Sequence, residues 1–158
     1  VMSSINYDDI FSSFLSNVTD YKIATQDEDV TTEQLTEYLH KVVGTPYINA
    51  LFMAIELDDN ASVLTYTMKN PDVNPSNDHY FMINMLGKAM VYEWIHPQVR
   101  KTSLLAQMFS GKEVKWYAQS NHIAELRGIE EDTELEVRRM IRDRGFSSNT
   151  YLGGAVND

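Results

Sequence analysis

Glu93 and His96 are the residues whose types and spacing come closest to a metal-binding or catalytic pattern. On a helix, Glu-x-x-His places both side chains on one face, as in di-iron helical bundles. Those centres need the motif twice and two further glutamates, whereas it occurs once here, directly before Pro97. The simpler interpretation is a histidine at a helix C-terminus, where its charged form suits the helix dipole. We therefore expect no metal site.

The remaining residue types offer no recognisable active site either. The absence of cysteine excludes disulfides, thiolate catalysis and cysteine-based zinc sites. There is no Gly-x-Ser-x-Gly motif, P-loop or glycine-rich dinucleotide loop. We expect neither an enzyme nor a cofactor, with an active site built from scattered residues as the open alternative. The four histidines share no metal-ligand spacing: His40, His79, His96 and His122.

The net charge of −10 is unevenly distributed along the chain. Residues 1–80 hold 13 acidic and 3 basic residues, and residues 81–158 hold 10 of each. DNA-gripping surfaces need clustered Lys and Arg, so we expect no specific binding of DNA. No segment is apolar enough for a transmembrane helix, and we expect no signal peptide because the N-terminus lacks a basic region followed by an apolar stretch.

The first half of the chain predicts two helices and a β-hairpin. Apolar residues recur at helical spacing over 7–18, and again over 32–44, where Thr31 or Thr32 can cap the helix. Residues 51–57 and 63–68 are rich in aromatic and branched residues and flank a polar turn, which predicts a hairpin over about 51–68. Two strands alone are marginal, so the hairpin should pack on helices or pair with a neighbouring subunit.

The second half predicts three further helices, over 77–95, 103–109 and from about 117 or 120 to 144. Pro97 should end the first of them, and Gly145 should cap the last. The helix over 77–95 is apolar on nearly every side, so we expect it to be buried. Its predicted core residues are Phe81, Met85, Tyr92 and Trp94.

The predicted fold is mainly α: a helical bundle around a buried central helix, with one inserted β-hairpin and an extended C-terminal tail. The helical domain should span residues 1–145. Residues 146–158 should form a flexible tail, which we expect to bind a partner through its spaced apolar side chains. Those side chains are Tyr151, Leu152 and Val156.

Two further groups are possible interface residues. Trp116 and Tyr117 lie in a short polar stretch between predicted helices and could serve a core or an interface equally well. A basic cluster on the last helix either complements the helix dipole or docks onto an acidic surface, such as the acidic N-terminal half of a neighbouring subunit. The cluster consists of Arg138, Arg139, Arg142 and Arg144.

Three blocks of the second half resemble small virion proteins of tailed bacteriophages that infect Gram-positive bacteria. Residues 92–99 contain Trp–aliphatic–x–Pro, with which a buried helix ends in those proteins. Residues 103–105 are Ser-Leu-Leu, and residues 116–127 contain Tyr-x-Gln-x-Asn-His-aliphatic, which opens a long last helix. An early Tyr-Asp-Asp-Ile helix is also similar. The chain resembles the head–tail connector, or adaptor, family of neck proteins over about residues 5–145, and most strongly over 90–127.

The resemblance implies a structural virion protein, assembled in the host cytoplasm and placed in the neck at the capsid portal vertex. Such proteins form a ring, usually of twelve copies, which docks on the portal protein and is followed by a downstream neck or tail protein. The ring extends the channel through which DNA passes. The alternatives are another neck or tail-completion protein, such as a stopper or terminator, or a small intracellular regulator that binds host proteins.

Overall fold

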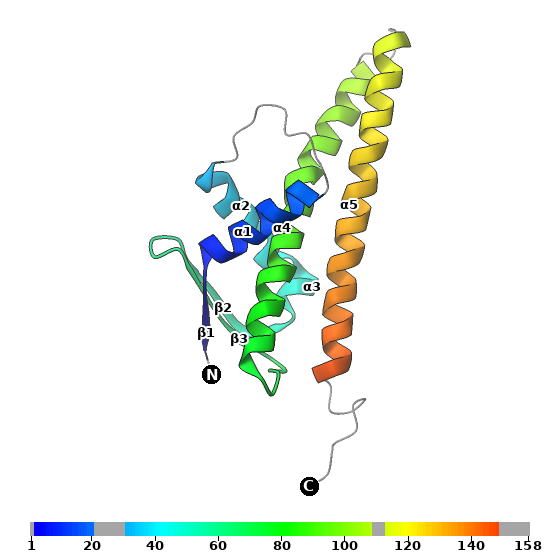
Figure 1. Cartoon of the computed structure of the whole chain (residues 1–158). Coiled ribbons are helices and arrows are strands. Elements are labelled where there is room, and N and C mark those ends of the chain that lie inside the picture. The colour runs from blue at the N-terminus through cyan, green and yellow to red at the C-terminus, as the bar shows by residue number, and fades with distance from the viewer. Residues whose placement is uncertain (1, 21–30, 109–112, 149–158) are drawn as a thin grey trace.

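The protein is mainly helical, with a small antiparallel sheet at one side (Figure 1). The computed structural model describes residues 2–20, 31–108 and 113–148, and the side chains of 2–18, 31–100 and 124–145. None of the helices in these ranges combines the length and apolar character needed to cross a membrane. The elements are β1 (Ser3–Asn6), α1 (Tyr7–Asp20), α2 (Thr32–Gly44), α3 (Pro46–Asn49), β2 (Phe52–Asp58), β3 (Val63–Met68), α4 (Pro75–Met108) and α5 (Glu113–Ser148).

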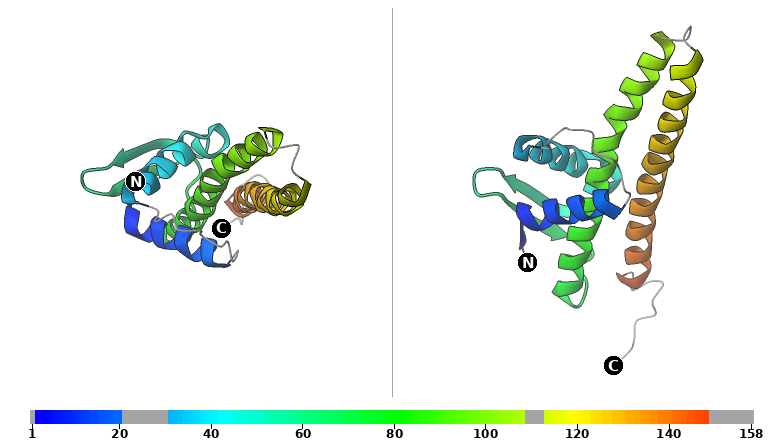
Figure 2. Two further views of the ribbon diagram at one scale, coloured as in Figure 1. Left: turned by 90° about the horizontal axis from the view of Figure 1, so that it is seen from above. Right: turned by 45° about the horizontal axis from the view of Figure 1, so that its top comes forward.

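The long helices α4 and α5 lie side by side and antiparallel (Figure 1). The sheet and the helices α1, α2 and α3 gather around the first half of α4 (Figure 1, Figure 2). The second half of α4 and the first half of α5 project beyond this group as a two-helix arm. We call this projection the α4–α5 arm.

The predicted hairpin is confirmed as β2 and β3, but its third strand was not predicted. The sheet order is β1-β3-β2, so the N-terminal strand pairs with β3 along one edge. β1 contains only Ser-Ser-Ile-Asn, in which Ile5 is the single residue of a type that indicates a strand. The chain's own N-terminus therefore supplies the pairing that two strands lack.

The first two long helices follow their predicted local sequence signals. α2 begins with a capping box, in which the Thr31 hydroxyl accepts a hydrogen bond from the Gln34 backbone and the Gln34 side chain accepts one from the Thr31 backbone. α1 extends two residues beyond its predicted end at Val18.

The predicted helix end at Pro97 is wrong, because α4 continues through this proline to Met108. The separate short helix expected over 103–109 is therefore the end of α4. A proline inside a helix costs about 3 kcal/mol. Ile95 and Val99, on either side of it, are buried, and burial of two such side chains contributes about 1.5–3 kcal/mol each. Pro97 itself is exposed, so its ring does not disturb the core.

The predicted stop at Gly145 is also wrong, because α5 remains helical to Ser148. Residues 146–148, expected in the tail, thus belong to this helix. A glycine favours a helix end by adopting a left-handed conformation, but packing can keep it helical. Here Arg144 fixes the last turns of α5 to the start of α4.

The main core lies between α4 and the group formed by α1, α2 and the sheet. Of the four residues predicted in the core, Met85 is fully buried and Trp94 is buried with its ring edge-to-face against Phe14. Phe81 and Tyr92 are only half-buried: Phe81 still packs against the core, whereas Tyr92 does not belong to it, which corrects the expectation for Tyr92. α4 is therefore not covered on all sides: Phe81 lies under the Arg144 guanidinium, and Tyr92 lines a cavity.

Gly87 allows α1 to approach α4 closely. A Cβ atom at Gly87 would lie 2.3 Å from the Ser13 hydroxyl oxygen and 2.7 Å from its Cβ. Atoms at such distances overlap, so any larger residue would push α1 away from the core. At Gly128 on α5, by contrast, nothing lies within 4 Å of a built Cβ.

We predict opposite effects for the same substitution at these two glycines. Gly87→Ala should lower the free energy of unfolding by about 1–3 kcal/mol, as overpacking does. Gly128→Ala should raise it by about 0.5–1 kcal/mol, because alanine is the better helix former. Urea denaturation measures both, and stabilisation by both variants would contradict the close approach of α1 and α4.

Candidate functional site

The predicted interface arginines lie on the C-terminal half of α5. Arg138, Arg139 and Arg142 are all exposed. Arg138 pairs with Glu134 at 3.2 Å and lies over the ring of Tyr47, 4.2 Å from its centroid. Arg138 thus connects α5 to α3, whereas Arg139 and Arg142 present positive charge to solvent.

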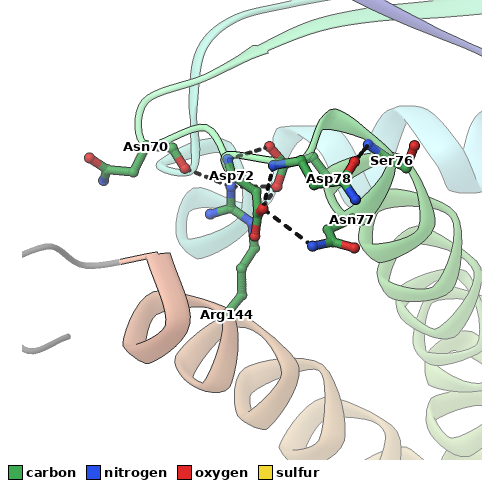
Figure 3. A network of polar contacts seen from close by, with 7 residues as sticks. Asn70, Asp72, Ser76, Asn77, Asp78 and Arg144 are labelled. Atoms are coloured by element: carbon green, nitrogen blue, oxygen red, sulfur yellow. Dashed lines mark hydrogen bonds and ion pairs between the residues drawn. The ribbon is translucent and has the colours of Figure 1, made fainter. Parts of the chain in front are cut away.

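Arg144, the fourth arginine of the cluster, has a different environment (Figure 3). Its guanidinium donates to Asp78 at 2.7 Å and 3.0 Å and to the Asn70 carbonyl at 2.7 Å. The side chains of Arg144 and Asp78 are only 9% and 8% exposed. The second Asp78 oxygen accepts a hydrogen bond from the Asp72 backbone, so one carboxylate holds both the loop before α4 and the end of α5.

We predict that Arg144→Met lowers the free energy of unfolding by about 3 kcal/mol, because it leaves Asp78 buried without its counter-ion. The matched control is Arg142→Met. Arg142 pairs with Asp143 at 3.5 Å on an exposed surface, so its loss should cost less than about 1 kcal/mol. If urea denaturation showed equal losses for the two substitutions, the buried pair would contribute no more to the free energy of unfolding than the exposed pair, and the prediction would be wrong.

A cavity of about 430 Å³ opens between α3, α4 and α5, beside Arg138. Its size lies in the range of small-ligand pockets. Its walls combine apolar side chains with two tyrosines and two glutamates. The lining residues are Val42, Thr45, Pro46, Tyr47, Ile48, Ala89, Tyr92, Glu93, Glu134 and Arg138.

Burial shifts Glu93, Tyr47 and Tyr92 of the cavity towards their neutral forms. It raises the pKa of the Glu93 carboxyl, an effect that Lys41 and His96 partly oppose. Burial also raises the pKa values of the Tyr47 and Tyr92 hydroxyls, which therefore remain protonated donors at neutral pH. Glu93 forms no hydrogen bond or ion pair with any residue that the structure describes.

No protein-family model matches the chain, and no curated protein or solved structure matches it either.

His96, the second residue of the Glu-x-x-His pattern, pairs with Glu130 across the α4–α5 interface. The Tyr92 ring stacks on the imidazole, with centroids 5.4 Å apart. His96 is thus oriented towards α5 by its hydrogen bond with Glu130, and the Tyr92 ring of its own helix supports the imidazole. Within the described ranges, no group of three or more potential ligands could hold a metal ion.

A polar cluster near the turn between β2 and β3 was not predicted. Asp59 accepts a hydrogen bond of 2.7 Å from the Tyr7 hydroxyl and lies 2.9 Å from Nε2 of His40. These two partners lower the pKa of Asp59, while burial and the nearby carboxylates raise that of Tyr7. The cluster ties α2 to the hairpin. Its members are far apart in sequence, so no local spacing could reveal it.

The remaining predicted partner residues cannot be placed in a site. Trp116 and Tyr117 lie in the first turns of α5 rather than in a connector, and their side chains are outside the described ones. Tyr151, Leu152 and Val156 lie outside the described residues altogether.

Proposed function

We propose that the protein is a head–tail connector of a tailed bacteriophage, a structural component that binds the portal protein and extends the DNA channel towards the tail. The observation that carries the proposal is the position of the sequence block that resembles this family. Of this block, residues 92–108 lie in the second half of α4 and residues 113–127 in the first half of α5, the two segments that make up the α4–α5 arm (Figure 1). A projecting pair of helices is well placed to contact neighbouring subunits.

The charge distribution supports the same function. The acidic surface of the first half of the chain would repel DNA, and a channel lined by it would let DNA slide. The exposed Arg139 and Arg142 offer an opposite charge, onto which an acidic neighbouring copy could dock. In this proposal α4 is the central helix of a bundle, and about twelve copies form the ring, as in the family that the chain resembles.

The helical architecture argues against a stopper or tail terminator, because those neck proteins are mostly β. Here α4 and α5 alone hold 34 and 36 of the 158 residues. A small regulator that binds host proteins remains the second candidate class. Mass distinguishes the two, since a regulator stays small in the presence of portal protein, whereas a connector joins it.

The experiment is a mass measurement of the full chain mixed with a portal protein encoded in the same genome. We expect a complex with several copies of the chain per portal ring. If the chain stays at its free mass in the mixture, the proposal is wrong. Genes for portal, capsid and tail proteins on either side of this gene would independently support it.

A second variant tests the predicted role of the tail in the same measurement. Replacing Tyr151, Leu152 and Val156 with serine should weaken portal binding and leave helicity and thermal unfolding unchanged. Weak contacts repeated around a ring add up, so the loss of affinity for the portal should be larger than the loss expected from one isolated contact. Normal portal binding by this variant would remove the tail from the interface.

We predict no measurable affinity for duplex DNA at physiological salt, because net charge −10 offers few phosphate contacts. Fluorescence anisotropy with a labelled duplex measures this. Tight binding that weakens steeply with added salt would overturn the proposed sliding channel.

A further inference from the structure

The cavity between α3, α4 and α5 has the chemistry of a site for an organic cation. Glu93 and Glu134 supply two carboxylates, and Tyr47 and Tyr92 supply two aromatic rings. Val42, Ile48 and Ala89 add apolar surface between them. Carboxylates and aromatic faces attract cations, and apolar walls bind an alkyl stem.

The protein already holds one guanidinium at the rim of this cavity. Arg138 lies 4.2 Å from the centroid of the Tyr47 ring and 3.2 Å from the Glu134 carboxylate. One tyrosine and one glutamate therefore suffice here to position a guanidinium. The rim thus provides an internal example of the contacts that a second cation would make.

Glu93, on the α4 wall, has no such direct contact with a cation among the described residues, although Lys41 and His96 act on it from a distance. It is half-buried, and the described residues give it neither a hydrogen bond nor an ion pair. The nearby cations are already engaged: Lys41 pairs with Glu37 at 3.2 Å, and His96 pairs with Glu130. A partly desolvated carboxylate without a partner is costly, and an incoming cation would relieve this cost.

We propose that this cavity binds the side chain of an arginine or lysine on the surface of a partner protein. The cationic group would lie at Glu93, and its alkyl stem would pack against the apolar wall. A protein is the favoured source because the chain's net charge of −10 steers basic surfaces towards it. The inference does not depend on the connector function, because it follows from the cavity and from the net charge of the chain.

The first test uses Nα-acetyl-arginine amide as the probe, and Nα-acetyl-citrulline amide as a control of the same shape without charge. NMR titration of the full chain should show saturable shifts of cavity residues with the arginine probe only. Equal shifts with the citrulline compound, or no saturation with either, would overturn the proposal.

Two variants locate the binding. Glu93→Gln should weaken the arginine probe about tenfold, because it removes the charge and keeps the shape. The matched control is Glu131→Gln on α5, an exposed residue outside the cavity, which should bind as the unaltered chain does. Equal weakening by both variants would show a general charge effect and would contradict a site at Glu93.

Arg138→Gln is expected to strengthen binding of the probe, whereas a variant that failed to fold would bind the probe less tightly. This change removes the competing guanidinium from Tyr47 and Glu134, so the arginine probe should bind severalfold more tightly. Unchanged or weaker binding would contradict the assignment of the cavity to cations.

A last comparison tests the source of the cation. A capped peptide with an arginine between two leucines should bind more tightly than propylguanidine, a free guanidinium compound with the same single charge, because a partner surface adds contacts around the cavity mouth. If propylguanidine bound more tightly than the peptide, the site would belong to a small molecule, and the proposal of a protein partner would be wrong.

Discussion

The attachment of α5 to α4 is the interaction on which the rest of the structure depends. Among the described side chains of α5, Leu126 and Val137 are buried, and Ile129, Met140 and Ile141 pack against the core while partly exposed. Polar contacts supplement these apolar ones within the described ranges: Lys88 with Glu136 at 2.6 Å, His96 with Glu130, and the buried Arg144 with Asp78. Removing either partner of the buried pair would leave a charge without compensation. These contacts set the register of the two helices, and through it the position of every functional group that α5 carries.

Two functional features follow from that register. The cavity exists because α5 places Glu134 and Arg138 opposite Tyr47 of α3 and Glu93 of α4. The α4–α5 arm exists because the two helices continue side by side past the group formed by the sheet, α1, α2 and α3 (Figure 2). A cavity for a basic side chain and a projecting arm both suit a protein that works by contacting other proteins. The acidic charge of the first half favours basic partner surfaces over DNA.

Local patterns predicted much of the fold, and tertiary packing decided the rest. The capping box at Thr31 and the two runs of branched residues in the hairpin are local, so α2, β2 and β3 were predicted correctly. Pro97 and Gly145 were expected to end helices. The buried residues next to Pro97 keep α4 helical beyond it, and the contacts of Arg144 keep α5 helical beyond Gly145. The cavity could not be predicted, because its walls come from segments up to 96 positions apart, between Val42 and Arg138. The basic cluster was predicted as one group, yet burial separates Arg144, a structural residue, from its exposed neighbours.

If the chain is a connector, its copies form a ring on the portal around a channel for DNA. Electron microscopy of the assembled complex of the chain with its portal protein would show this ring. We expect about twelve copies below the portal, with an open channel along the axis and the α4–α5 arm in contact with neighbouring subunits. Isolated copies on the outer surface of the portal, or a closed axis without a channel, would contradict it.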